Sequence, residues 1–147
     1  MAINIDARYR VRRNAEQEEQ MRYIVQELKL FGSYAQVVIA SAIVGYNFDA
    51  YVPFDKYASD GILMQFFAER DKDIINMIAY AKSKNQDILR KDPLEMYRIF
   101  EAYANGGFPI LMNKLGVDFV DKTKNDRLTL LRKYYSCLLS NSLKGRK

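Results

Sequence analysis

The chain has 147 residues, of which 49% are apolar and 28% are charged, and these values are typical of one soluble globular domain with a sizeable core. It contains no histidine and one cysteine, Cys137, which excludes Ser-His-Asp and Cys-His catalysis, histidine-ligated zinc and an internal disulfide. The net charge of +5 is concentrated at the ends, because residues 1–13 and 144–147 each carry +3 and the body carries −1. We therefore expect a basic N-terminal arm (1–13), a helical domain (14–143) and a basic tail (144–147).

The N-terminal arm alternates between apolar and polar residues. Odd positions are apolar and even positions are mostly basic, with the apolar row at Ile3, Ile5, Ala7, Tyr9 and Val11 and the polar row at Asn4, Asp6, Arg8, Arg10 and Arg12. A period of two predicts a β-strand with one apolar and one basic face. Its backbone groups need a partner, which we expect to be either the same strand of a second protomer or a short stretch at residues 51–54.

Two helices are predicted to follow the arm. Asn14 and Gln17 have the spacing of a capping box, and an apolar stripe continues to Phe31 before Gly32 ends the helix. The next segment, from Ser33 to Gly45, has an N-cap residue at its start and a glycine at its end. Its apolar residues cover every side of a helix, so we expect a buried central helix. The order strand, helix, helix resembles a ribbon-helix-helix unit, whose paired strands can enter a DNA groove.

The middle of the chain shows weaker periodicity. Residues 46–61 read as a loop packed on the core, and residues 62–67 are ambiguous between helix and strand. Asp71 is expected to cap the helix that follows. The mixed charges of residues 69–73 are typical of a solvated helix start rather than of a metal or acid-base site.

The last part of the chain is predicted to hold three helices. Asp92-Pro93-Leu94-Glu95 is a strong helix start, and Asn105-Gly106-Gly107 is expected to end that helix. A short helix restarts at Pro109, and Thr123 with Asp126 caps the last helix, whose core-facing residues are expected to be Leu128, Leu131, Tyr134, Tyr135, Leu138 and Leu139. The predicted fold is mainly α: one compact domain of about six helices around the central helix.

Several segments together resemble a known bacterial family. They are Arg8-Tyr9-Arg10-Val11, the run from Tyr34-Ala35-Gln36-Val37-Val38 to Gly45, Val52-Pro53-Phe54, and Phe100-Glu101-Ala102-Tyr103-Ala104-Asn105-Gly106-Gly107 with Ile110-Leu111. With gaps, from about residue 8 to about residue 115, the chain resembles the DNA phosphorothioation-associated protein 4 family. The Glu-x-Tyr-Ala-Asn-Gly-Gly run is the most specific part. The resemblance implies an accessory protein of systems that put sulfur into the DNA backbone or restrict DNA that lacks it, in antiphage defence, and it carries over no catalytic residue.

The sequence therefore predicts a nonenzymatic accessory protein that uses no cofactor and no metal. The expected partners are duplex DNA, other proteins of the defence system and a second copy bound through the N-terminal strand. The residues expected to contact DNA are the cations of the two ends: Arg8, Arg10, Arg12, Arg13, Lys144, Arg146 and Lys147. The alternative is an adaptor that binds another protein without touching DNA.

Two further expectations concern catalysis and location. Glu27-Leu28-Lys29 spells the Glu-x-Lys pattern of some nucleases, but it lies on a predicted helix, so we expect no catalysis there. The start of the chain lacks the features of a secretory signal, and a single cysteine fits a reducing compartment. We expect a cytoplasmic protein with no membrane segment.

Overall fold

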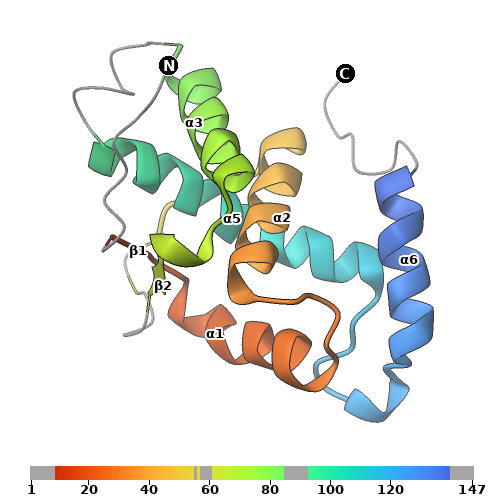
Figure 1. Cartoon of the computed structure of the whole chain (residues 1–147). Coiled ribbons are helices and arrows are strands. Elements are labelled where there is room, and N and C mark those ends of the chain that lie inside the picture. Colours follow the sequence, from red (N-terminus) through yellow and green to blue (C-terminus); the bar gives the residue numbers. More distant parts are fainter. Residues whose placement is uncertain (1–8, 55, 57–60, 85–92, 140–147) are drawn as a thin grey trace.

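The computed structural model describes residues 9–54, 56, 61–84 and 93–139. Within these ranges the chain forms five α-helices and a two-stranded antiparallel sheet (Figure 1). The helices are α1 (Ala15–Arg22), α2 (Tyr34–Asn47), α3 (Glu69–Ser83), α5 (Pro93–Leu115) and α6 (Arg127–Leu139), and the strands are β1 (Arg10–Val11) and β2 (Ile62–Leu63). Shorter helical turns are η1 (Tyr23–Glu27), η2 (Met64–Phe66) and η3 (Lys122–Lys124). The mainly α fold class is confirmed, with five helices rather than about six.

The difference in helix number arises in α5, which continues through Asn105-Gly106-Gly107 and Pro109. The expected break between two helices is therefore wrong. Proline at 109 has no N–H to donate to the carbonyl of residue 105, which would leave that oxygen without its helical partner. The side-chain amide of Gln17 donates to this carbonyl at 3.1 Å and so replaces the missing bond.

The two glycines of α5 are needed for close packing rather than for a turn. A Cβ atom on Gly107 would lie 1.8 Å from the carbonyl oxygen of Ser41 in α2, and one on Gly45 would lie 2.0 Å from the carbonyl oxygen of Tyr103. A Cβ atom on Gly106 would lie 2.0 Å from the carbonyl oxygen of Ala50. The backbones of α2 and α5 therefore touch directly, and this pair forms the most extensive helix contact of the fold.

Helix α2 begins as predicted, because the Ser33 hydroxyl accepts a hydrogen bond from the Gln36 backbone N–H at 3.2 Å. It does not end at Gly45, which lies inside the helix at the contact with α5. The expectation of complete burial is also only partly met. One stripe of α2 stays half-buried or exposed, and its members are Gln36, Ala40, Ile43, Tyr46 and Asn47.

The predicted N-terminal strand is confirmed over its described part, and its partner lies within the same chain. Arg10 pairs with Leu63 and Val11 with Ile62 in an antiparallel register. The stretch at 51–54 forms no strand; the backbone N–H of Val52 instead donates to the carbonyl of Ala102 in α5 at 3.1 Å. Val11 is fully buried and Arg10 is exposed, as the alternation predicts.

The ends of the outer helices differ from the predictions in detail. Asn14 caps α1 through a 2.8 Å bond from the Glu16 N–H, but α1 passes into the π-helical turn η1 instead of running to Phe31. Helix α3 begins at Glu69, and the Asp71 carboxylate accepts from the Ala68 N–H just before it. Asp126 directly precedes α6, but Thr123 does not take part in this helix start, because it belongs to the separate turn η3.

Helix α6 lies at the edge of the bundle, with α2 between it and α3 in Figure 1. Leu130, which the sequence pattern did not assign to the core, is its buried residue among positions 127–136. Leu128 and Tyr135 were expected to face the core, yet 61% and 57% of their surfaces are exposed. They are seven residues apart and so lie on one side of the helix, away from Leu130.

We expect Gly107→Ala to destabilise the protein by about 3 kcal/mol, because the new Cβ would overlap backbone atoms of α2 that cannot move aside. Helix propensity alone predicts the opposite sign, a gain of about 1 kcal/mol. Urea unfolding followed by circular dichroism measures the difference. The matched control is Gly32→Ala, whose Cβ would meet only the flexible side chain of Gln36 at 3.2 Å. Equal unfolding midpoints for the two variants would contradict the packing argument.

Candidate functional site

The most buried polar group of α5 is the Glu101 carboxylate, which is 1% exposed. One of its oxygens, Oε2, accepts from the Arg12 backbone N–H at 2.7 Å and from the Tyr9 hydroxyl at 3.1 Å. The other, Oε1, accepts from Arg12 Nε and from Arg98 Nη1, both at 2.9 Å. Two guanidinium groups and two neutral donors therefore compensate the cost of burying this charge. Glu101 fastens the N-terminal arm to the centre of the fold.

Tyr9 completes this attachment. Its ring stacks on Tyr97 of α5, with ring centroids 3.9 Å apart and an angle of 11° between the planes. Burial, together with the negative charge of Glu101, raises the pKa of Tyr9. The hydroxyl stays protonated at neutral pH and can donate to the carboxylate.

One helical turn further along α5, Asn105 joins two more segments to the same face. Its Oδ1 accepts from Asn14 Nδ2 at 2.8 Å, and its Nδ2 donates to the Val52 carbonyl at 2.8 Å. With Gln17 bound to its backbone carbonyl, Asn105 holds the start of α1 and the loop after α2. The Glu-x-Tyr-Ala-Asn-Gly-Gly run (residues 101–107) is thus in contact with the arm, α1, α2 and the loop after α2. We call this run the joint.

The cations predicted to contact DNA have different surroundings in the structure. Arg12 is bound to Glu101, and Arg13 is buried with its Nη2 3.5 Å from Glu18 Oε2 and its guanidinium 4.8 Å from the centre of the Tyr34 ring. Arg10 is exposed, and its Nη1 donates to the Gly61 carbonyl at 3.3 Å. The remaining four, Arg8, Lys144, Arg146 and Lys147, lie outside the described residues.

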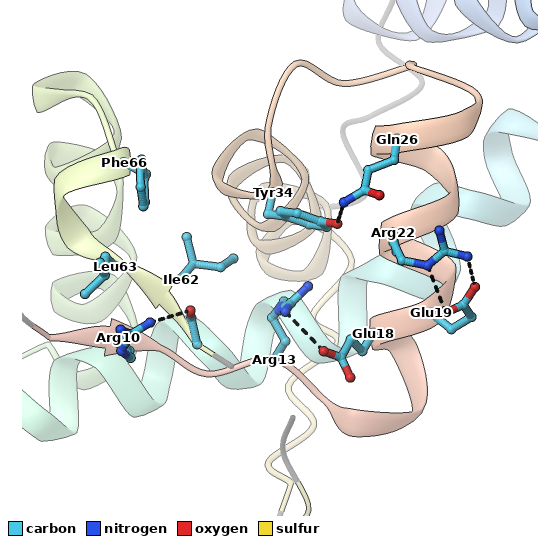
Figure 2. Close-up of a pocket in the computed structure, with 11 residues that line it drawn as sticks. Arg10, Arg13, Glu18, Glu19, Arg22, Gln26, Tyr34, Ile62, Leu63 and Phe66 are labelled. Atoms are coloured by element: carbon cyan, nitrogen blue, oxygen red, sulfur yellow. Dashed lines mark hydrogen bonds and ion pairs between the residues drawn. The ribbon is translucent and has the colours of Figure 1, made fainter. Parts of the chain in front are cut away.

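Arg10 and Arg13 line an open cleft of about 610 Å³ beside the sheet (Figure 2). One wall comes from β2 and η2, the opposite wall from α1 and η1, and Tyr34 at the start of α2 lies between them. We call this the arginine cleft; its lining residues are Arg10, Arg13, Glu18, Glu19, Arg22, Gln26, Tyr34, Gly61, Ile62, Leu63 and Phe66.

The charges of the arginine cleft are partly paired within it. Glu18 is paired with Arg13, and Glu19 is paired with Arg22, whose Nε donates to Glu19 Oε1 at 3.0 Å. The hydrogen bond from Arg22 lowers the pKa of Glu19, so this carboxylate stays ionised well below neutral pH. Arg10 has no carboxylate of the described residues within ion-pair distance. Three guanidinium groups against two carboxylates give the lining a net charge of +1.

Sequence reasoning missed both the joint and most of the cleft. Glu101 and Asn105 did carry a signal, since two polar residues four apart in an apolar helical run lie on one helix face. No sequence pattern indicated the cleft. It brings together residues 10–13, 18–34 and 61–66, and no local pattern relates positions about fifty residues apart.

Two common kinds of site are absent from the described ranges. No helix there is long and apolar enough to cross a membrane. No three or more Cys, Asp or Glu side chains there come together in a group that could hold a metal ion.

Comparison with known proteins identifies the family. No curated protein and no solved structure matches the chain. A family model described as DNA sulphur modification system-associated protein 4 matches residues 10–138, which takes in the Glu101–Gly107 run and extends beyond the segments of the resemblance through most of α6. This match covers most of the 147 residues. The chain therefore belongs to the family of DNA sulphur modification system-associated protein 4.

Proposed function

We propose that the protein is a nonenzymatic adaptor of a DNA sulphur modification system and that it binds another protein of that system through an apolar face of α2 and α3. The family gives the setting. The observation that carries the proposal is an apolar depression of about 350 Å³ between these two helices. We call it the α2–α3 face; it is lined by Ile43, Tyr46, Asn47, Ile74, Met77, Ile78 and Ala81.

The α2–α3 face has the properties of a protein-binding surface. Its lining contains no charged side chain, and Asn47 and the Tyr46 hydroxyl are its polar groups. Met77 projects at its rim with 67% of its surface exposed. Methionine adapts its shape to an apolar partner, and exposed apolar patches of this kind mark interaction sites. This lining contains no cationic side chain that could bind a phosphate backbone.

A second depression continues the face along α2. It has a volume of about 210 Å³ and is bounded by residues of α2, α3, α5 and α6, among them Ala40, Leu111 and Tyr134. Ile43 lines both depressions, so the open stripe of α2 forms a continuous floor. From Gln36 to Asn47 the floor is about 16 Å long, at a rise of about 1.5 Å per helical residue. This length matches about three turns of a partner helix.

The nonenzymatic part of the proposal is supported by the surroundings of the one nuclease-like pattern. Glu27 lies in the π-helical turn η1 and its carboxylate is 3.3 Å from Arg22. Glu27 therefore forms an ordinary surface ion pair with Arg22.

We expect Met77→Glu to weaken binding to the partner at least tenfold. Losing the burial of a methionine side chain costs about 1.5–3 kcal/mol, and each 1.4 kcal/mol corresponds to about a tenfold change in Kd. The measurement is co-purification of the protein with each tagged protein of its own system, followed by titration of the pair that forms. Val120→Glu is the matched control, since Val120 is 98% exposed and lies away from the face. Undiminished binding by Met77→Glu would exclude the face.

A second candidate function is contact with duplex DNA through the basic ends of the chain. It is favoured by Arg10, which is exposed beside the buried Arg13 at the start of the described chain. Arg8, Lys144, Arg146 and Lys147 stay predicted contacts. Arg12 is a weaker candidate than the sequence suggested, because a phosphate would have to compete with the Glu101 carboxylate for its guanidinium.

If duplex DNA is bound through the arm, Arg10→Ala should lower the slope of log affinity against log salt by about 0.9, the value for one lost phosphate contact. Arg12→Gln should leave the slope unchanged, because its guanidinium is bound to Glu101. Fluorescence anisotropy of a labelled duplex across a salt series gives both slopes. Identical slopes for the wild type and Arg10→Ala would remove this candidate, as would the absence of any binding at physiological salt.

A further inference from the structure

The aromatic side chains of the arginine cleft, Phe66 and Tyr34, are used neither by an adaptor role nor by contact with a DNA duplex. We propose that this cleft is a nucleotide site, with the phosphate beside Arg10 and the base against Phe66. The ligand is one nucleotide unit, which can be a free mononucleotide or an unpaired nucleotide of a DNA strand. This inference goes beyond the adaptor role and does not depend on it.

The wall formed by β2 and η2 offers a surface for a flat apolar group. Phe66 is 63% exposed, and its ring stands on this wall with Ile62 and Leu63 near it in Figure 2. The wall faces a cleft that already contains a second aromatic ring, that of Tyr34. Aromatic side chains exposed beside cationic groups are the elements on which unpaired bases stack.

The cation beside this wall is available for an anion. Arg10 uses one N–H on the Gly61 carbonyl at 3.3 Å, and a guanidinium carries five N–H donors in all. The planar fork of these donors matches two oxygens of a phosphate. Because Glu18 and Glu19 are paired with Arg13 and Arg22, the net charge of +1 on the lining is centred at Arg10.

The opposite wall supplies acceptors for the edge of a base. The amide Nε2 of Gln26 donates to the Tyr34 hydroxyl at 2.7 Å, so this donor is already used. The carboxylates of Glu18 and Glu19 and the carbonyl oxygen of Gln26 accept hydrogen bonds only. Exocyclic amino groups of adenine, cytosine and guanine are donors that such acceptors recognise.

The pairing of charges in the lining decides between a single nucleotide and a longer backbone. A duplex groove would bring several phosphates into the cleft, but Glu18 and Glu19 already pair with Arg13 and Arg22, so Arg10 is the guanidinium of this lining that remains for a phosphate. One phosphate at Arg10 also stays clear of the two carboxylates, which lie on the other wall (Figure 2). The volume of about 610 Å³ lies within the range of about 300–1,000 Å³ that is usual for small-molecule sites.

The test is isothermal titration of the whole chain with four probes: deoxyadenosine monophosphate, deoxyribose 5-phosphate, a short single-stranded DNA and the corresponding duplex. We expect saturable binding of the mononucleotide, of the single strand or of both, and which of them binds identifies the source of the nucleotide unit. Deoxyribose 5-phosphate should bind at least about tenfold more weakly than deoxyadenosine monophosphate, because it lacks the base that stacks on Phe66.

Two variants examine the two halves of the site separately. Phe66→Ala and Arg10→Gln change exposed side chains, so both should keep the wild-type unfolding midpoint, and each should weaken binding about tenfold. Arg132→Gln, an exposed cation on α6, is the control and should bind like the wild type. The proposal is overturned if no probe saturates below about 1 mM, if Phe66→Ala binds as tightly as the wild type, or if only a duplex binds.

Discussion

The backbone contact between α2 and α5 is the constraint on which the rest of the structure depends. Gly45 and Gly107 lie where a Cβ atom on either would overlap the other helix, so the two helices meet without intervening side chains. This close approach brings Glu101, Asn105 and Gly106, from the same stretch of α5, against the arm, the start of α1 and the loop after α2. Packing, buried hydrogen bonds and strand pairing therefore form one connected unit, in which each contact relies on the position of the two helices.

The sequence predicted the elements that local chemistry determines. The N-caps at Asn14 and Ser33, the alternation around Val11 and the mainly helical class are confirmed. It failed where tertiary packing overrides local preference. Asn105-Gly106-Gly107 has the composition of a helix end, yet packing against α2 keeps it helical, and Gln17 supplies the hydrogen bond that Pro109 removes. The partner of β1 and the lining of the arginine cleft depend on long-range proximity, which no local period encodes.

The basic arm is bound within the fold through two of its cations. Its positive charge suggested a row of DNA contacts, but Arg12 and Arg13 pair with the carboxylates of Glu101 and Glu18. The Glu-x-Tyr-Ala-Asn-Gly-Gly run, the most specific part of the family resemblance, is correspondingly an internal joint. The surfaces left for partners are outside it: the uncharged α2–α3 face and the mixed aromatic and charged lining of the arginine cleft. A protein partner and a nucleotide would occupy different sides of α2, so both could bind at once.

The ion pair between Arg12 and Glu101 fastens the arm to α5. A double-mutant cycle measures this interaction directly, using the unfolding free energies of the wild type, Glu101→Gln, Arg12→Gln and the double variant. The two side chains are in contact at 2.9 Å in a largely buried setting, so we expect a coupling energy of about 1–3 kcal/mol. A coupling below about 0.3 kcal/mol, the level expected of independent sites, would contradict it.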